Sequence, residues 1–355
     1  MNRSSSYVDT NFWAPLHGLR GIAVLYVVFS HLGLMGLPLL PVAHDAIGKV
    51  GVWIFFVLSA FLLTSRLRVD LERAPSRAVA LGVYFVRRAF RIYPLFVAAL
   101  VAHVIAGEIS VSDILDHLLL QSGYGELWAI PVEFKYYFVI PVIAYLSVRM
   151  PNHWYLVAAL GVALFAMTMY TLQKPNAVFS NQVSLVPKLA PFIAGSMLAL
   201  AFNPGRRGTH APSASWPVIP ITGVALLIAT TIAFRSMRMD MLTRAVSPWL
   251  SLMISLAVVT LIYSSFQNGP VRWILKQMPL VFVGEISFSI YLIHLFVLRQ
   301  VMMLDFTSPT LKAWISVASV IVCATITYWL IERPGMRVGK IVTQMLKRHL
   351  VARKG

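Results

Sequence analysis

An arginine and a histidine lie eleven residues apart in the first apolar segment of the chain. The segment opens with LHGLRG at residues 16–21, and its far end carries His31. On an α-helix, eleven residues turn through about 1100°, so Arg20 and His31 share one face, roughly 16 Å apart along the axis. Ionisable groups in apolar helices usually face a protein interior or a wet cavity. The pair predicts a site that binds an anion and moves a proton. The alternative is that Arg20 extends to the membrane interface and His31 makes a structural hydrogen bond.

Three arginines, Arg87, Arg88 and Arg91, stand at helical spacing just before the third apolar segment. Guanidinium groups bind phosphates through planar, charge-assisted hydrogen bonds. The cluster therefore predicts a clamp for a phosphorylated cytoplasmic ligand. An ordinary basic cluster at the cytoplasmic end of a membrane helix is the alternative.

The fourth apolar segment opens with LWAIPVE at residues 127–133. Pro131 predicts a kink, because proline removes a backbone donor. Glu133 needs a partner or a neutral state within an apolar segment. A functional carboxylate and a structural kink with a paired glutamate both fit these residues.

Polar residues recur on one helix face of the ninth apolar segment, at Gly284, Ser287, Tyr291 and His294. One interpretation is helix packing through small and hydroxyl residues. The other is that Tyr291 and His294 line the same cavity as His31.

The composition indicates a protein with several membrane helices. The 355 residues are 58% hydrophobic and 12% charged, with a mean hydropathy of +0.75, unlike an ordinary soluble domain. The net charge of +17 lies in short segments between apolar runs. That distribution argues against nucleic acid as a partner and is typical of basic segments flanking membrane helices.

Apolar runs of about 18–25 residues suit membrane-spanning helices rather than barrel strands. We expect an all-α integral membrane bundle of about ten helices near residues 16–35, 50–66, 92–107, 127–147, 154–172, 186–202, 216–234, 247–266, 279–300 and 312–331. With both termini cytoplasmic, the inner segments hold 20 Lys and Arg residues and the outer segments hold 8. This asymmetry favours that orientation.

The chain divides into a transmembrane domain at 1–334 and a tail at 335–355. The motif ERP at 332–334 predicts a helix stop with an interfacial charge pair. The tail is basic and has apolar residues at helical spacing, so we expect it to lie on anionic membrane lipid at the cytoplasmic surface.

Taken in order, seven motifs resemble the membrane-bound acyltransferase-3 family. They are LHGLRG at 16–21, the spacing from Arg20 to His31, FFVLSAFL at 55–62, RRAFRIYP at 87–94, LWAIPVE at 127–133, YLIH at 291–294 and ERP at 332–334. Each motif is weak alone, but together they run through nearly the whole chain. The chain departs from the family pattern at His17, where the family has Asp, at Ala60, where it has Gly, and at Phe134, where it has Glu or Gln.

The resemblance implies a ten-helix enzyme that transfers an acyl group, often acetyl from acetyl-CoA, to a carbohydrate hydroxyl. The family's essential arginine and histidine fall on Arg20 and His31. Its Arg-x-x-Arg pair, thought to handle the acyl-CoA, falls on Arg88 and Arg91. His17 in place of Asp puts in doubt any partner that this position supplies to Arg20 or His31.

The hypothesis is a membrane O-acyltransferase of the bacterial inner membrane that uses no metal. Its acceptor is a carbohydrate or lipid-linked saccharide, such as a cell-surface or exopolysaccharide precursor. The expected catalytic residues are His31 as general base, Arg20 and Glu133; Arg87, Arg88 and Arg91 hold the acyl-CoA; and Trp128, Tyr291 and His294 contact the acceptor. With Arg20 near the cytoplasm, His31 lies toward the outer half, which favours acyl delivery across the membrane. The rival is a transporter of an anionic or lipid-linked saccharide, which the lack of internal repeats disfavours.

Overall fold

The computed structural model describes residues 10–37, 39, 47–74, 76–202, 223, 228 and 241–352. All secondary structure in these ranges is helical. The first half contains α1 (Thr10–Leu34), α2 (Ile47–Arg73), α3 (Arg77–Ile105), η1 (Val111–Asp113), α4 (Ile114–Leu118), η2 (Gly125–Trp128), α5 (Ala129–Arg149) and α6 (Trp154–Gln173). The second contains α7 (Pro175–Phe179), η3 (Val186–Lys188), α8 (Leu189–Ala201), α10 (Met241–Ser265), α11 (Pro270–Leu275), α12 (Met278–Glu285), α13 (Ser287–Met302), α14 (Pro309–Thr327), η4 (Tyr328–Glu332) and α15 (Arg333–Ala352).

Seven helices in the described ranges are long and apolar enough to cross a membrane, and an eighth span arises if α12 and α13 count as one. These spans cover eight of the ten predicted ranges. The range 186–202 forms a shorter apolar helical segment, Val186–Ala201. The range 216–234 falls almost entirely outside the described residues. The all-helical prediction is therefore confirmed for the part described, and the count of ten stays a prediction.

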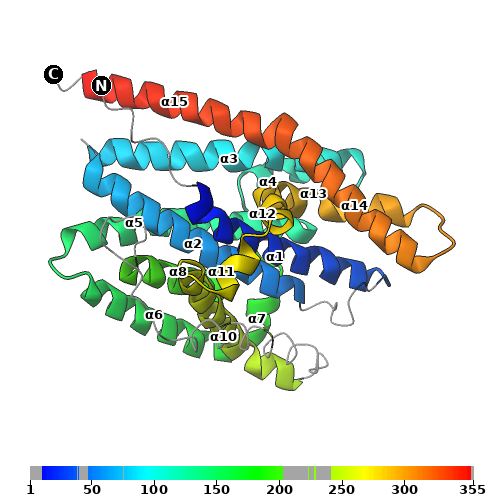
Figure 1. Ribbon diagram of the computed structural model, residues 1–355, viewed down its shortest axis with the longest axis horizontal. Helices are drawn as coiled ribbons and strands as arrows, with labels where there is room; N and C mark the ends of the chain where they lie inside the picture. The colour runs from blue at the N-terminus through cyan, green and yellow to red at the C-terminus, as the bar shows by residue number, and fades with distance from the viewer. Residues whose placement is uncertain are drawn as a thin grey trace.

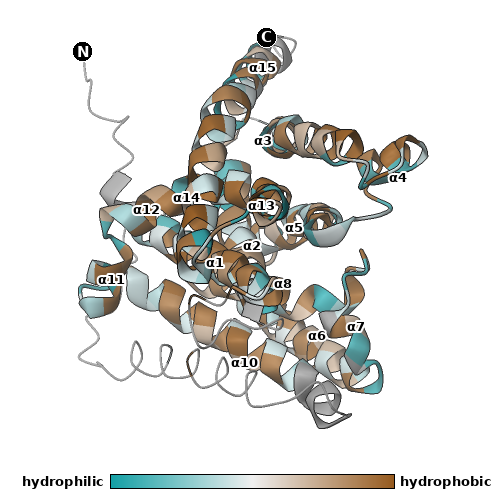
Figure 2. Cartoon of the chain, turned by 90° about the vertical axis from the view of Figure 1, so that its right-hand side faces the viewer, coloured by the Kyte–Doolittle hydropathy of each residue, from teal (hydrophilic) through white to brown (hydrophobic). Residues whose placement is uncertain are grey.

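The helices form a bundle with α1, α2 and α13 in its middle (Figures 1 and 2). Helices α3 and α15 lie together on one side, and α6 and α10 lie on the other. Among the candidate spans in the described ranges, α2 is the most enclosed, with 78% of its apolar window buried, and Ser289 and His294 of α13 are fully buried. Polar side chains on α1, α2 and α13 therefore face protein rather than lipid, as their cost in hydrocarbon requires.

Helix α1 crosses α12 with almost no space between the backbones. A Cβ placed on Gly284 would lie 1.7 Å from the carbonyl oxygen of His17, and one on Gly21 would lie 2.4 Å from that of Leu280. Only glycine permits this approach, and small residues are the usual means of close helix packing in membranes. Gly21 of the first motif and Gly284 of α12 thus fix α1, and with it Arg20, against α12.

The predicted ninth span is bent rather than straight. Helices α12 and α13 meet at an angle of 75° at Ile286, so Gly284 lies on α12 while Ser287, Tyr291 and His294 lie on α13. The expectation of one continuous face from 284 to 294 is therefore wrong. The close crossing of Gly284 with α1 holds α12 in its own direction, and the chain turns at Ile286 to begin α13.

The predicted helix stop at 332–334 is also wrong, because the chain stays helical from α14 through α15. A π-helical turn, η4, precedes Pro334 and widens the backbone where the proline ring would otherwise strike the preceding turn. Gly335 and Gly339 then bring α15 against Pro94 and Phe90 of α3. The tail thus packs on the bundle along one face. Its exposed apolar residues, Val338, Ile341 and Met345, leave the other face free.

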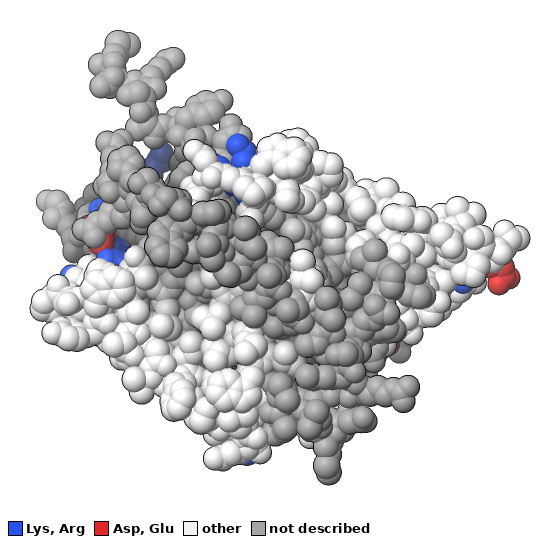
Figure 3. All heavy atoms as spheres, turned by 60° about the horizontal axis from the view of Figure 1, so that its bottom comes forward, with Lys and Arg blue, Asp and Glu red and all other residues white. Residues whose placement is uncertain are grey.

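Much of the outer surface is apolar. The face in Figure 3 carries few Lys, Arg, Asp or Glu among the described residues, and the charged ones gather toward its edges. The outward faces of α5, α6 and α14 expose large apolar side chains, including Phe138, Val142, Val162, Phe165, Val322 and Ile326. An exposed surface of this kind is stable in lipid and costly in water.

Candidate active site

Two pockets lie toward opposite ends of α1, and each holds part of the predicted chemistry. The first, which we name the arginine pocket, has about 700 Å³ of empty space, including the solvent at its mouth, and is lined by residues of α1, α2, α3, α5 and α13. Its polar lining residues are Arg20, Ser59, Arg88, Arg91, Glu133, Tyr137, Ser287 and Tyr291.

Arg20 is fixed at the point where α13 begins. Its Nε donates a hydrogen bond to Ser287 Oγ at 3.2 Å, and its guanidinium carbon lies 5.7 Å from the centre of the Phe55 ring. Ser287 is the first residue of α13, where a helix carries partial positive charge. Arginine and helix terminus together make this end of the pocket favourable for an anion.

The three arginines of α3 have different surroundings. Arg91 Nη2 lies 3.5 Å from Glu332 Oε1, and Arg91 Nη1 lies 3.0 Å from Met336 Sδ. Arg88 lines the pocket without a hydrogen bond or ion pair to any described residue. Arg87 is not among the lining residues, and its Nη1 lies 4.0 Å from Asp70 Oδ2. The three arginines of the predicted clamp therefore differ. Arg88 lines the pocket unpaired, Arg91 lines it paired with Glu332, and Arg87 lies outside it.

The carboxylate of the arginine pocket belongs to Glu133. Its Oε1 accepts hydrogen bonds from Ser59 Oγ and, at 2.8 Å, from Tyr137 Oη. The glutamate thus has the partners that a carboxylate in an apolar span requires. Pro131 does not kink the middle of a helix as predicted, because α5 begins at Ala129 and the proline lies in its first turn. Proline is tolerated there, since the first backbone N–H groups of a helix have no partner within it.

The second pocket, which we name the histidine pocket, has about 620 Å³ of empty space, including the solvent at its mouth. Its polar and aromatic lining residues are His31, Lys49, Glu126, Trp128, Asn181 and Tyr291. Arg20 and His31 therefore share α1, as the spacing predicts, but they line different pockets.

A second histidine orients His31. His31 Nδ1 lies 2.9 Å from the carbonyl oxygen of Val27 and 3.2 Å from His294 Nε2. His294 Nδ1 lies 2.7 Å from the carbonyl oxygen of Tyr291. Because a carbonyl only accepts, both Nδ1 atoms carry the proton, and His294 Nε2 accepts from His31. This assignment leaves His31 Nε2 with a free lone pair, as a general base requires.

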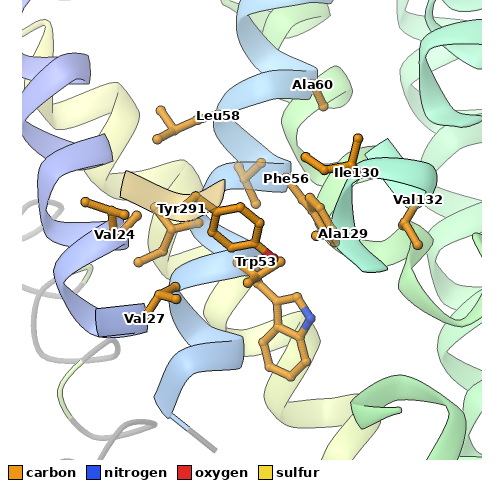
Figure 4. Close-up of a cluster of buried hydrophobic side chains, with 14 of the residues drawn as sticks. Val24, Val27, Trp53, Phe56, Leu58, Ala60, Ala129, Ile130, Val132 and Tyr291 are labelled. Atoms are coloured by element: carbon orange, nitrogen blue, oxygen red, sulfur yellow. The ribbon is translucent and has the colours of Figure 1, made fainter. Parts of the chain in front are cut away.

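Tyr291 forms part of the wall between the two pockets. It lines both of them, as does Val52, and its hydroxyl donates to the backbone carbonyl of Glu126 at 2.7 Å. Figure 4 shows its ring among apolar side chains of α1 and α2, including Val24 and Trp53. Tyr291 thus lines the same pocket as His31, whereas His294, predicted to line it as well, is not among its lining residues. His294 is fully buried behind His31 and contacts it directly.

Trp128 lines the histidine pocket, but the side chain of Lys49 lies over its ring. The residue is 3% exposed, and the Lys49 ammonium lies 4.0 Å from the centre of its ring. Sugar stacking on Trp128 would therefore require Lys49 to move. Sequence reasoning did not identify Lys49 or Glu126 as site residues; the position of Glu126 directly before the LW motif was the available signal.

A charged cluster lies behind Glu126. His103 Nδ1 lies 2.5 Å from Glu108 Oε2, and His103 Nε2 lies 3.6 Å from Glu126 Oε1. Arg299 Nη1 lies 2.7 Å from Glu108 Oε2. Burial raises the pKa of the Glu108 carboxyl, but hydrogen bonds from His103 and Arg299 outweigh it, so its pKa is below the usual value. The described residues contain no group of three or more His, Cys, Asp or Glu side chains placed to hold a metal ion.

Comparison with known proteins places this chain in a family. The model of the acyltransferase domain family, acyltransferase-3, matches residues 13–332. The chain therefore belongs to the acyltransferase-3 family, and its long apolar helices make it an integral membrane protein.

Relatives are similar at low identity. The chain is 23% identical to the peptidoglycan O-acetyltransferase OatA of Listeria monocytogenes, over 96% of this chain and 58% of OatA. It is 26% identical to the acyltransferase MdmB of Streptomyces mycarofaciens, over 80% of this chain and 78% of MdmB. It is 24% identical to a putative O-acetyltransferase of Staphylococcus aureus, over 94% of this chain and 59% of that protein. The chain thus spans little more than half the length of two of these relatives. No solved structure matches it significantly.

Proposed function

We propose that the protein transfers an acyl group from acyl-CoA, in the first instance acetyl-CoA, to a hydroxyl of a carbohydrate acceptor. The observation that carries the proposal is the pair of adjoining pockets, one lined by arginines and the other by a histidine with a free Nε2. Membership of the acyltransferase-3 family and the names of the O-acetyltransferase relatives support it.

The arginine pocket is the donor site in this proposal. Arg88 is free to meet a phosphate of CoA, and Arg91 stands one helical turn further along α3. Arg20, which is hydrogen-bonded to Ser287, contacts negative charge of the donor deeper in the pocket. Because CoA is a cytoplasmic metabolite, this assignment orients the pocket toward the cytoplasm, with both chain termini on the same side.

His31 acts as general base in the histidine pocket. Its Nε2 takes the proton of the acceptor hydroxyl as the hydroxyl oxygen attacks the thioester carbonyl carbon. The carbon–sulfur bond breaks, CoA leaves as the thiolate, and the proton passes from His31 to that sulfur. The products are the O-acyl ester and CoA. A positioned base contributes about 10²–10⁴-fold to the rate.

The acyl group must pass the wall formed by Val52 and Tyr291 to reach His31. Tyr291 is held there by its hydrogen bond to the Glu126 carbonyl. On the donor side, Glu133 holds the hydroxyls of Ser59 and Tyr137 beside the path. We therefore assign Glu133 the role of positioning those hydroxyls along the path of the acyl group. Tyr291 forms the wall that the acyl group passes between the donor and acceptor pockets. The acceptor then enters from the outer side of a bacterial inner membrane.

Acyl transfer by the purified protein in lipid tests the proposal. Labelled acetyl-CoA is supplied with a mixture of glycoside acceptors, and ester product is measured for wild type, His31→Ala and Arg88→Ala. Product from wild type, with little from either variant, supports the assignment. Saccharide counterflow without ester formation would instead establish the rival transporter.

A further inference from the structure

One lysine at the histidine pocket has no role in the chemistry described above. Lys49 lies in the first turn of α2, and its ammonium lies 4.0 Å from the centre of the Trp128 ring. The same ammonium donates to Asn181 Oδ1. Lys49 and Asn181 both line the pocket that holds His31. An amine that can carry positive charge therefore lies where an acceptor would enter.

No acidic side chain of the described residues neutralises that charge within ion-pair distance. Glu126, the carboxylate that lines the same pocket, faces His103 instead. With Glu108 and Arg299, these groups form a cluster of two carboxylates, one guanidinium and one imidazole. The cluster balances its own charge when the imidazole is protonated, so it does not offset the charge of Lys49.

A second lysine adds to the positive potential. The Lys188 ammonium lies 5.2 Å from the same Trp128 ring. It is turned toward backbone carbonyls, with Gln182 O at 2.9 Å, and the residue is 1% exposed. Lys188 is therefore structural, whereas half-buried Lys49 remains able to exchange its amide partner for a ligand.

We infer that the acceptor is an anion, a hydroxyl compound that carries a carboxylate or phosphate group beside the reacting hydroxyl. Lys49 binds the anionic group and thereby presents the hydroxyl to His31 Nε2. An ammonium is a compact charge that pairs with either oxyanion, and desolvation at the pocket strengthens the pairing. This inference rests on the proposed acyl transfer and names the class of its acceptor.

The test compares acceptors that share one sugar ring. Methyl glucoside is neutral, methyl glucuronide carries a carboxylate, and glucose 1-phosphate carries a phosphate. The kcat/KM for acetyl transfer to each is measured with wild type, Lys49→Met, Lys49→Arg and Lys174→Met in lipid. Lys174 is the matched control, because its ammonium also lies over an aromatic ring, that of Tyr170 at 5.3 Å, and it does not line the pocket.

Wild type should prefer one or both anionic acceptors, and the ratio of anionic to neutral kcat/KM should fall about 10- to 100-fold in Lys49→Met. Lys49→Arg and Lys174→Met should keep the preference. The acceptor with the larger ratio identifies carboxylate or phosphate as the bound group. A wild-type enzyme that acetylates the neutral glucoside as well as both anions would overturn the inference while leaving acyl transfer intact, and this result needs no variant to fold. Absence of both acetyl transfer and acetyl-CoA hydrolysis would instead refute the proposed function.

Discussion

The arginine and histidine pockets differ in how their charged groups are held. In the arginine pocket, Arg91 is paired with Glu332 and Arg20 with Ser287, while Arg88 has no ion pair or hydrogen bond among the described residues. In the histidine pocket, the ring of His31 is fixed at Nδ1 by a carbonyl and by a second imidazole. The arginine pocket thus keeps the Arg88 guanidinium available for an anion, and the histidine pocket keeps the lone pair of His31 Nε2 available for a proton.

This contrast separates binding from proton transfer. A free guanidinium contributes to affinity for an anionic donor in the ground state and the transition state alike. A base contributes only as the proton moves, so its loss lowers turnover more than affinity. Variants of the two pockets should therefore affect different kinetic constants.

His31→Ala should lower the rate of acyl transfer by about 10²–10⁴-fold, because it removes the proposed general base. Binding of acyl-CoA should stay within about twofold, since His31 does not line the arginine pocket. Single-turnover kinetics and equilibrium donor binding measure the two quantities. A folded His31→Ala protein with wild-type turnover would transfer the role of base to another residue.

Arg88→Ala should weaken acyl-CoA binding by about 10- to 150-fold, the usual effect of losing a charge-assisted contact. Arg91→Ala should chiefly lower stability, because it leaves the buried Glu332 carboxylate without its cation. Donor titration and thermal unfolding distinguish these effects, and the double variant Arg91→Met with Glu332→Gln should recover stability. Equal losses of donor affinity in both single variants, with unchanged unfolding, would contradict this division.

His294→Ala should lower turnover by about 2- to 13-fold, the range expected for one hydrogen bond. The effect is smaller than that of His31→Ala because the Val27 carbonyl still orients His31 Nδ1. Turnover across a pH series checks this, since a positioning role should alter the pH profile as well as the rate. A profile unchanged in shape and height would show that His294 does not orient the base.

Glu108→Gln should destabilise the protein at neutral pH by about 1.5–3 kcal/mol, because it removes the charge that His103 and Arg299 contact. The pKa of Glu108 is lowered in the folded state. Its contribution is therefore present above the unfolded pKa of about 4.5 and is lost as pH falls through the lower folded value. Thermal unfolding should show a difference between wild type and Glu108→Gln at pH 7 that shrinks below about pH 4. A pH-independent difference would contradict the ionic role.

Local patterns in the sequence predicted the helices well but not their breaks. Long apolar runs require membrane helices, and the described ranges contain them. The 75° bend at Ile286 depends on the contact between Gly284 and α1, and the helical continuation through Pro334 depends on the packing of α15 against α3. Both are long-range contacts, which periodicity along one segment does not contain.

The same distinction applies to the candidate site. Helical spacing correctly placed Arg20 and His31 on one helix, but the wall at Val52 and Tyr291 divides their surroundings into two pockets. The pairing of Arg91 with Glu332 joins residues 241 positions apart, and Lys49 meets Asn181 across 132. Neither pairing follows from the spacing of a motif, because each is set by how distant helices pack.

Acyl transfer across a sealed membrane tests the two-pocket account most directly. Labelled acetyl-CoA is enclosed in proteoliposomes, and an impermeant glycoside acceptor is supplied outside; a second preparation holds both substrates in the same compartment. The account predicts ester product on the outside acceptor when donor and acceptor are separated, and its loss in His31→Ala. Product that forms only when both substrates share a compartment would contradict it.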